Sequence, residues 1–176
     1  MSVAEHIQKS IRTVSDFPIE GINFKDITSI LLDPKLTNLI IEEFVKRIKL
    51  LKIDAIVGVE SRGFLFGFML ANKLNIPFIP IRKSGKLPLK TIKYSYDLEY
   101  GSAEVEVHAD DIKPNWNVLI HDDLLATGGT ALAAAELVKS SNANVVGFAF
   151  IISLDSLSGY QKILNYSKNI ISLYNC

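Results

Sequence analysis

The chain has 176 residues, 48% of them hydrophobic and 22% charged, which is the composition of one globular domain spanning residues 1–176. Nineteen basic and nineteen acidic residues give a formal net charge of zero, so the overall charge does not favour nucleic acid as a partner. The only cysteine, Cys176, has no partner for a disulfide, and no apolar run is long enough for a signal peptide or a membrane span, so we expect a cytoplasmic protein without a membrane partner.

The first predicted helix covers residues 3–14, where apolar side chains recur at helical spacing. A proline and a glycine then end it and lead into the segment GINFKDIT. Phe24 lies in this segment between Asn23 and Lys25, in what we expect to be a short extended piece. Burial statistics alone favour a core position for Phe24.

A packing helix over residues 35–51 is predicted next, followed by a buried strand over 53–59 and an apolar helix that begins at Gly63 and continues through Leu74. Arg62 stands at the junction between that strand and that helix. An arginine beside the N-terminal amides of a helix can bind a phosphate group, although most surface arginines form only weak ion pairs.

A third buried strand over residues 77–82 leads into a basic segment, KSGKLPLKTIK, at residues 83–93. Its four lysines, glycine and proline predict a mobile loop. Such segments are usually solvated surface, but cations concentrated in a chain of zero net charge favour a lid that closes on an anionic substrate. Polar and apolar residues alternate over residues 94–98 and 103–108. This pattern predicts a β-hairpin, with Glu104 and Glu106 on one face.

The most informative stretch is NVLIHDDLLATGGTALAAAELV, residues 117–138. Its apolar start predicts a strand buried on both faces. Asp122 and Asp123 predict an acidic turn, and the alanine-rich end predicts a helix. Two adjacent glycines within residues 126–130 allow backbone N–H groups to converge at the helix N-terminus, where a phosphate can bind without a lysine. The carboxylates can accept hydrogen bonds from ribose hydroxyls, so the pattern predicts a phosphorylated sugar as the ligand.

Other phosphate motifs and metal sites fit poorly. No lysine lies within residues 117–138, which excludes a P-loop there, and the adjacent glycines do not match the dinucleotide fingerprint GxGxxG. His121 precedes the two aspartates, but neighbouring strand residues point to opposite faces, so we expect it beside the site and not in it. Because His6 and His108 have no second ligand at metal spacing, we expect no metal bound by protein side chains alone.

Four segments together resemble a known family. The strand, the Asp-Asp pair and ATGGT resemble the phosphoribosyl pyrophosphate (PRPP) motif of type I phosphoribosyltransferases, and the longer form DDLLATGGT is similar to that of the adenine phosphoribosyltransferases. FPxxGxxFxDIT around Phe24, GVESRGFLFG around Arg62 and LEYG at residues 98–101 agree with that family. The resemblance runs from residue 17 to about residue 174.

Alternating strands and helices predict an α/β fold with ligands at the carboxyl ends of parallel strands. The resemblance makes this a type I phosphoribosyltransferase fold: a mainly parallel sheet flanked by helices, a small N-terminal hood and a flexible β-hairpin lid. It implies a glycosyltransferase of purine salvage, a homodimer that converts adenine and PRPP into AMP and pyrophosphate. It also implies Mg²⁺ bound mainly through the phosphates of PRPP.

The resemblance assigns roles to individual residues. It implies that PRPP or AMP is bound by Asp122, Asp123, Ala126, Thr127, Gly128, Gly129 and Thr130. It implies that pyrophosphate is bound by Ser61, Arg62, Arg82, Lys83 and Lys86, with a cis peptide between Glu60 and Ser61. Adenine would be bound by Asn23, Phe24, Lys25 and Leu124, Phe24 stacking on the purine. Glu99, Arg62 and Tyr100 would be the catalytic residues, with Glu99 handling a purine proton.

Two alternatives remain. One is a sister phosphoribosyltransferase for 6-oxopurines, against which the Phe24 segment and LEYG argue. The other is a regulator that keeps this fold as a PRPP sensor. Regulators that resemble bacterial purine repressors carry an additional DNA-binding domain, and this chain has neither the room nor the basic charge for one.

Overall fold

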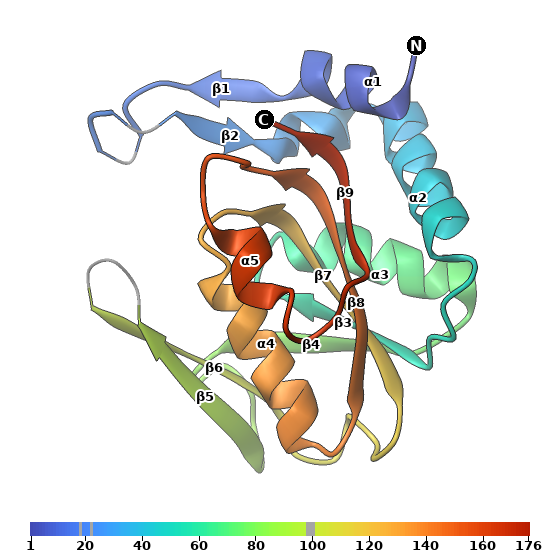
Figure 1. Ribbon diagram of the computed structural model, residues 1–176, viewed down its shortest axis with the longest axis vertical. Coiled ribbons are helices and arrows are strands. Elements are labelled where there is room, and N and C mark those ends of the chain that lie inside the picture. Colours follow the sequence, from blue (N-terminus) through green and yellow to red (C-terminus); the bar gives the residue numbers. More distant parts are fainter. Residues whose placement is uncertain (18, 22, 98–100) are drawn as a thin grey trace.

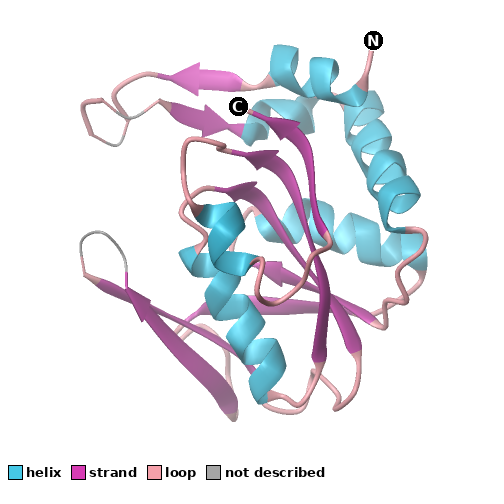
Figure 2. Cartoon of the chain, viewed as in Figure 1, coloured by secondary structure: helices cyan, strands magenta, loops and turns pink. Residues whose placement is uncertain are grey.

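Buried strands and helices alternate along the chain and form an α/β structure (Figures 1 and 2). The computed structural model describes residues 1–17, 19–21, 23–97 and 101–176. Within these residues the main sheet has seven strands, in the order β5-β6-β4-β3-β7-β8-β9. The strands are β3 (Ala55–Val59), β4 (Phe78–Lys83), β5 (Thr91–Asp97), β6 (Ser102–His108), β7 (Asn117–Leu125), β8 (Asn144–Ser153) and β9 (Ile170–Asn175). The strands from β4 to β9 in this order pair in parallel, and β5 and β6 form an antiparallel hairpin beside β4.

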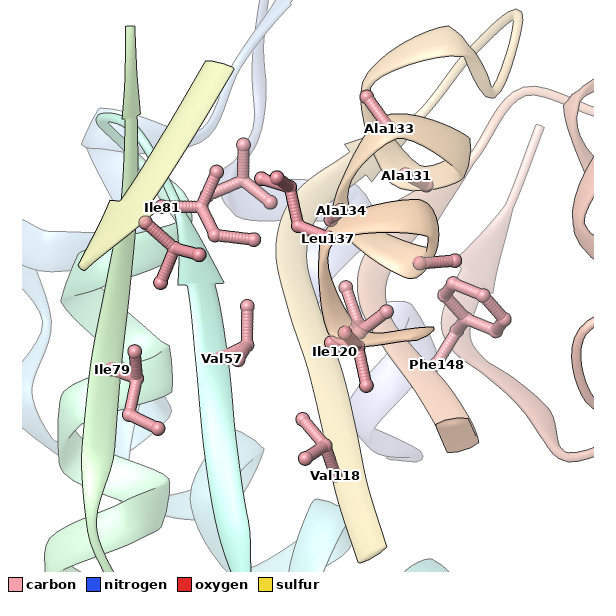
Figure 3. Close-up of a cluster of buried hydrophobic side chains, with 14 of the residues drawn as sticks. Val57, Ile79, Ile81, Val118, Ile120, Ala131, Ala133, Ala134, Leu137 and Phe148 are labelled. Atoms are coloured by element: carbon pink, nitrogen blue, oxygen red, sulfur yellow. The ribbon is translucent and has the colours of Figure 1, made fainter. Parts of the chain in front are cut away.

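Two hydrophobic clusters cover the two faces of the sheet, because successive strand residues point in opposite directions. The helices that pack on the sheet are α2 (Pro34–Ile48), α3 (Gly63–Leu74), α4 (Gly129–Ser140) and the short α5 (Gly159–Ile163). Ile56 and Leu119 pack against α2 and α3 on one face. Val57 and Ile120 pack under α4 on the other, as Figure 3 shows. None of the helices in the described part of the chain is both long and apolar enough to cross a bilayer.

The N-terminal segment differs from the prediction of one helix over residues 3–14. Helix α1 (Val3–Ser10) ends early, and Arg12–Val14 forms strand β1, which pairs antiparallel with β2 (Phe24–Asp26). The helical periodicity of residues 12–14 is overridden by this strand pairing. An ion pair of 2.9 Å between Arg12 and Asp26 stabilises the paired strands. A short 3₁₀ helix, η1 (Ile27–Leu32), follows. These elements form the hood in the upper part of Figure 1.

The central motif also differs in one respect. Strand β7 continues to Leu125, so Asp122 and Asp123 lie inside a strand and not in a turn. The reason is its long parallel pairing with β8, in which Asp122 lies opposite Phe150. The basic loop is likewise shorter than predicted and covers residues 84–90, because β4 includes Lys83 and β5 starts at Thr91.

Candidate active site

The glycine loop between β7 and α4 surrounds a small cavity. This cavity has a volume of about 80 Å³ and is lined by Asp122 and residues 124–131. Gly128 is the N-cap of α4 and has a φ of +76°, a conformation that favours glycine. A Cβ atom on Gly128 would also lie 2.8 Å from the carbonyl oxygen of Gly159. The loop therefore presents backbone at a helix N-terminus, which suits a phosphate group.

A second, larger cavity of about 370 Å³ adjoins the first. It is lined by Glu60, Ser61, Arg62, Lys83, Asp122, Asp123, Leu124 and Thr130. Asp122, Leu124 and Thr130 line both cavities, so the two adjoin. The loops that follow β3 and β7 meet here because these strands are parallel neighbours, as expected for ligand sites at the carboxyl ends of strands.

Arg62 connects three segments that lie far apart in the sequence. Its Nε atom is 2.8 Å from Oδ2 of Asp123, whose side chain is only 5% exposed. Its guanidinium carbon lies 5.3 Å from the centroid of the Phe24 ring, a cation–π geometry. The peptide bond between Glu60 and Ser61, just before Arg62, is cis, as the resemblance implies. Arg62 thus joins the hood, the loop after β3 and the acidic end of β7.

The two aspartates differ in environment. Burial, together with the charge of Asp123, raises the pKa of Asp122 well above its usual value. The backbone N–H of Asp123 donates a hydrogen bond of 2.9 Å to Oδ1 of Asp122. Asp122 therefore holds a proton more readily than an exposed aspartate does, and a cation or hydrogen-bond donor entering the cavity would favour its charged form.

Glu60 also lines the larger cavity, although no sequence motif gave it a binding role. Its carboxylate accepts hydrogen bonds from the Lys83 backbone N–H, at 2.9 Å, and from Nε of Arg82, at 3.2 Å. Burial raises the pKa of Glu60, but these hydrogen bonds outweigh it and leave the pKa below its ordinary value. Glu60 is therefore charged and holds the end of β4 against the loop that carries Arg62.

Comparison with known proteins agrees with this geometry. A family model described as a phosphoribosyl transferase domain matches residues 27–174. Adenine phosphoribosyltransferase of Clostridium botulinum is 48% identical over 175 residues, which are 99% of each chain. The chain belongs to the adenine phosphoribosyltransferase family.

Two crystal structures of adenine phosphoribosyltransferases share the whole fold. The enzyme of Thermoanaerobacter pseudethanolicus superposes with a TM-score of 0.95 at 46% identity, covering 98% of this chain and 99% of that one. The enzyme of Saccharomyces cerevisiae, complexed with D-2,5-dideoxy-2,5-imino-altritol 1,6-bisphosphate and adenine, superposes with a TM-score of 0.91 at 41% identity, covering 97% and 98%. The predicted type I phosphoribosyltransferase fold is confirmed.

Most residues predicted for the phosphate sites of an adenine phosphoribosyltransferase line the two cavities. The exceptions are Arg82 and Lys86, which line neither cavity. Arg82 is engaged with Glu60 and also donates to the carbonyl oxygen of Lys86, at 3.1 Å. Lys86 itself is exposed on the loop over residues 84–90. The roles of Arg82 and Lys86 in binding pyrophosphate stay predictions.

The residues predicted to bind adenine are more dispersed. Leu124 lines both cavities. Phe24 lines neither, but its ring contacts Arg62, which lines the larger one. Asn23 is exposed beside Phe24. Lys25 points to the other strand of the hood, where its Nζ atom lies 3.1 Å from Oγ1 of Thr13.

The predicted catalytic residues Glu99 and Tyr100 lie outside the described residues, so their roles stay predictions. The same hairpin contains Tyr96, which belongs to none of the sequence motifs. Its hydroxyl lies 3.3 Å from Oγ1 of Thr130, and a Cβ on Gly129 would lie 3.3 Å from its ring. Strand β5 of the predicted lid therefore packs directly on the glycine loop.

His121 lies next to the site and not in it, as predicted. Its ring is fully buried and packs edge-on against Phe44, with ring centroids 5.5 Å apart. It lies against α2 and α3, since its ring contacts Phe44 and a Cβ atom on Gly67 would lie 3.2 Å from that ring, whereas Asp122 lines the cavities. The alternation of side chains along β7 separates the two residues.

Proposed function

We propose that the two adjoining cavities transfer 5-phosphoribose from PRPP to adenine, forming AMP and releasing pyrophosphate. One observation carries the proposal: the glycine loop and the Arg62 loop lie on either side of the acidic pair in adjoining cavities. PRPP has the same order of groups, with a phosphate at one end, two hydroxyls on the ribose and a pyrophosphate at C1′.

Each part of the site has a role in this reaction. The glycine loop, residues 126–130, anchors the 5′-phosphate through backbone N–H groups and threonine hydroxyls. Asp122 and Asp123 accept hydrogen bonds from the ribose hydroxyls, and their negative charge stabilises the positive charge that develops on the ribose. Arg62 and Lys83 neutralise the departing pyrophosphate.

The base enters from the side of the hood. Purine N9 attacks C1′ of the ribose while the bond from C1′ to the pyrophosphate oxygen breaks, and the ring N–H proton of adenine is lost, for which Glu99 is the proposed acceptor. We assign stacking of the purine to Phe24, whose ring faces the same guanidinium that contacts Asp123. The yeast relative complexed with adenine supports adenine as the base.

We further propose that Mg²⁺ enters with PRPP. Within the described residues no group of three or more histidine, cysteine, aspartate or glutamate side chains is arranged to hold a metal ion. Asp123 is already paired with Arg62, so the site suits a cation that is bound mainly by phosphate oxygens and water. Such a cation would add positive charge at the pyrophosphate.

We also propose a cytoplasmic homodimer. Leu65 and Phe68 on α3 are 40% and 58% exposed, an apolar surface that fits a second copy of the chain. A lone cysteine suits a reducing compartment. Sedimentation equilibrium is expected to give twice the chain mass of 19.5 kDa, and Phe68→Glu to shift the protein toward monomer.

A substrate comparison tests the proposed activity. Pyrophosphate release from PRPP is measured with adenine, hypoxanthine and guanine in turn, each with Mg²⁺. We expect release with adenine and little with the two 6-oxopurines. Faster release with hypoxanthine or guanine would indicate the sister enzyme, and PRPP binding without release would indicate a sensor.

A further inference from the structure

Glu106 on β6 is a buried carboxylate outside the predicted site. The hairpin pattern places it on the same face as Glu104, yet its side chain is only 2% exposed. Its Oε1 atom accepts hydrogen bonds from the backbone N–H groups of Lys86 and Leu87, each at 2.9 Å. Its Oε2 atom accepts one from the hydroxyl of Thr91 at 3.1 Å. All three donors belong to the basic loop or to the residue that follows it.

These hydrogen bonds keep Glu106 charged. Burial raises the pKa of its carboxyl group, but the donors from Leu87, Lys86 and Thr91 outweigh burial, so the pKa lies below its usual value. Nζ of Lys93 lies 3.9 Å from Oε2 and adds a positive charge. A carboxylate buried with this many donors fixes the backbone that supplies them, because each lost hydrogen bond would leave a buried charge less satisfied.

A chain of contacts leads from Glu106 to the larger cavity. The carbonyl oxygen of Lys86, whose N–H binds Glu106, accepts a hydrogen bond from Nη1 of Arg82 at 3.1 Å. Arg82 in turn binds Glu60, and Glu60 and Lys83 line the cavity. The loop over residues 84–90 is therefore held through Lys86 on two sides, by Glu106 on β6 and by Arg82, which binds Glu60 of the cavity wall.

We propose that Glu106 is a positioning residue for the pyrophosphate end of PRPP. By fixing the basic loop, it holds Lys83, which lines the larger cavity where the leaving group is expected, and keeps Lys86 against Arg82. This inference rests on the proposed function, but it concerns only the binding of PRPP and not the identity of the base. Glu106 itself lies behind the loop and is not expected to touch the substrate.

Steady-state kinetics of two isosteric variants test the proposal. Glu106→Gln removes the charge, and Glu104→Gln is the matched control. Glu104 lies two residues away on the same face and also contacts Lys93, but its carboxylate binds Lys93 and Ser95 and not the backbone of the loop. We expect Glu106→Gln to raise KM for PRPP about tenfold, the scale of weakened hydrogen bonds to a charged group, and to leave KM for adenine within about twofold. Glu106→Ala should have a larger effect, and Glu104→Gln none.

A second variant covers the case in which substitution of Glu106 prevents folding. Thr91→Val removes one donor to Oε2 and should raise KM for PRPP about threefold, again without a change for adenine. If Glu106→Gln or Thr91→Val lowers the melting temperature but leaves both KM values unchanged, Glu106 is only structural and the inference is wrong. If the wild-type protein does not use adenine and PRPP, the proposed function fails instead.

Discussion

Arg62 is the single side chain on which the site depends most. Arg62→Lys keeps the positive charge but removes the Nε contact with Asp123 and the planar group over Phe24. We expect kcat/KM for PRPP to fall about a hundredfold, because both contacts lie in the predicted reaction site.

Arg47→Lys is the matched control for this experiment. Arg47 makes an ion pair of the same length, 2.8 Å from its Nε atom to Glu43, but on α2. An exposed pair of this kind contributes little, so activity should not change. Equal loss in both variants would show that the effect of Arg62 is not specific to the site.

His121 makes the stability of the protein depend on pH. Burial lowers the pKa of His121 from 6.5 to about 4. Between these values the unfolded chain binds a proton that the folded protein does not, so stability is lost as pH falls from 6.5 toward 4. Urea unfolding at pH 7.5 and 4.5 should show a contribution of about 2.5 kcal/mol that His121→Leu lacks.

The control for His121 is His6→Gln, which removes a partly exposed histidine on α1. It should keep the pH dependence of the wild-type protein. If His121→Leu and the wild type lose the same free energy of unfolding between the two pH values, then His121 is accessible to protons in the folded state.

Some residues of the site could be predicted from the sequence and others could not. The residue types of the glycine loop and the acidic pair were enough to predict a phosphorylated sugar, and alternation was enough to place His121 away from Asp122. Glu106 could not be predicted, because alternation gives two faces without saying which one a loop covers. The role of Glu60 could not be predicted either, since its partners Arg82 and Lys83 belong to a different strand.

At the scale of elements, α5 supports the glycine loop from outside the motif. A Cβ atom on Gly159 would overlap the carbonyl oxygen of Ala126. Gly159→Ala should therefore displace the loop and raise KM for PRPP about tenfold or more, the scale of an overpacked contact.

Ser158→Ala provides the comparison for Gly159→Ala. Ser158 is the N-cap of α5 but makes no capping hydrogen bond through its side chain, so its loss should leave KM unchanged. An unchanged KM for PRPP in Gly159→Ala would mean that the loop tolerates the added methyl group and that α5 does not position it.

Elements with a strong local pattern were predicted well. Helix α3 begins at Gly63 and ends at Leu74 as expected, because its apolar residues and its boundaries are local features. The prediction of an N-terminal helix is wrong beyond Ser10, and the residues predicted to form an acidic turn belong to strand β7. In both places pairing with a distant strand, β2 or β8, decides the conformation, and such pairing leaves no local signal.

At the scale of the whole molecule, parallel strands bring the functional loops together. The loops after β3, which ends at Val59, and after β7, which ends at Leu125, are far apart in sequence but are neighbours in space, because the two strands pair in parallel. The hood adds Phe24 from one side, and the hairpin adds Tyr96 from the other. The site is therefore a property of the fold and is not contained in any one segment.

A crystal structure of the protein with AMP would show which groups bind each part of the nucleotide. We expect the phosphate to bind at residues 126–130, the ribose hydroxyls to contact Asp122 or Asp123, and the purine to stack on Phe24. A phosphate bound instead in the separate cavity of about 490 Å³ beside α4 and α5, which includes Lys139 and Lys162, would contradict this expectation.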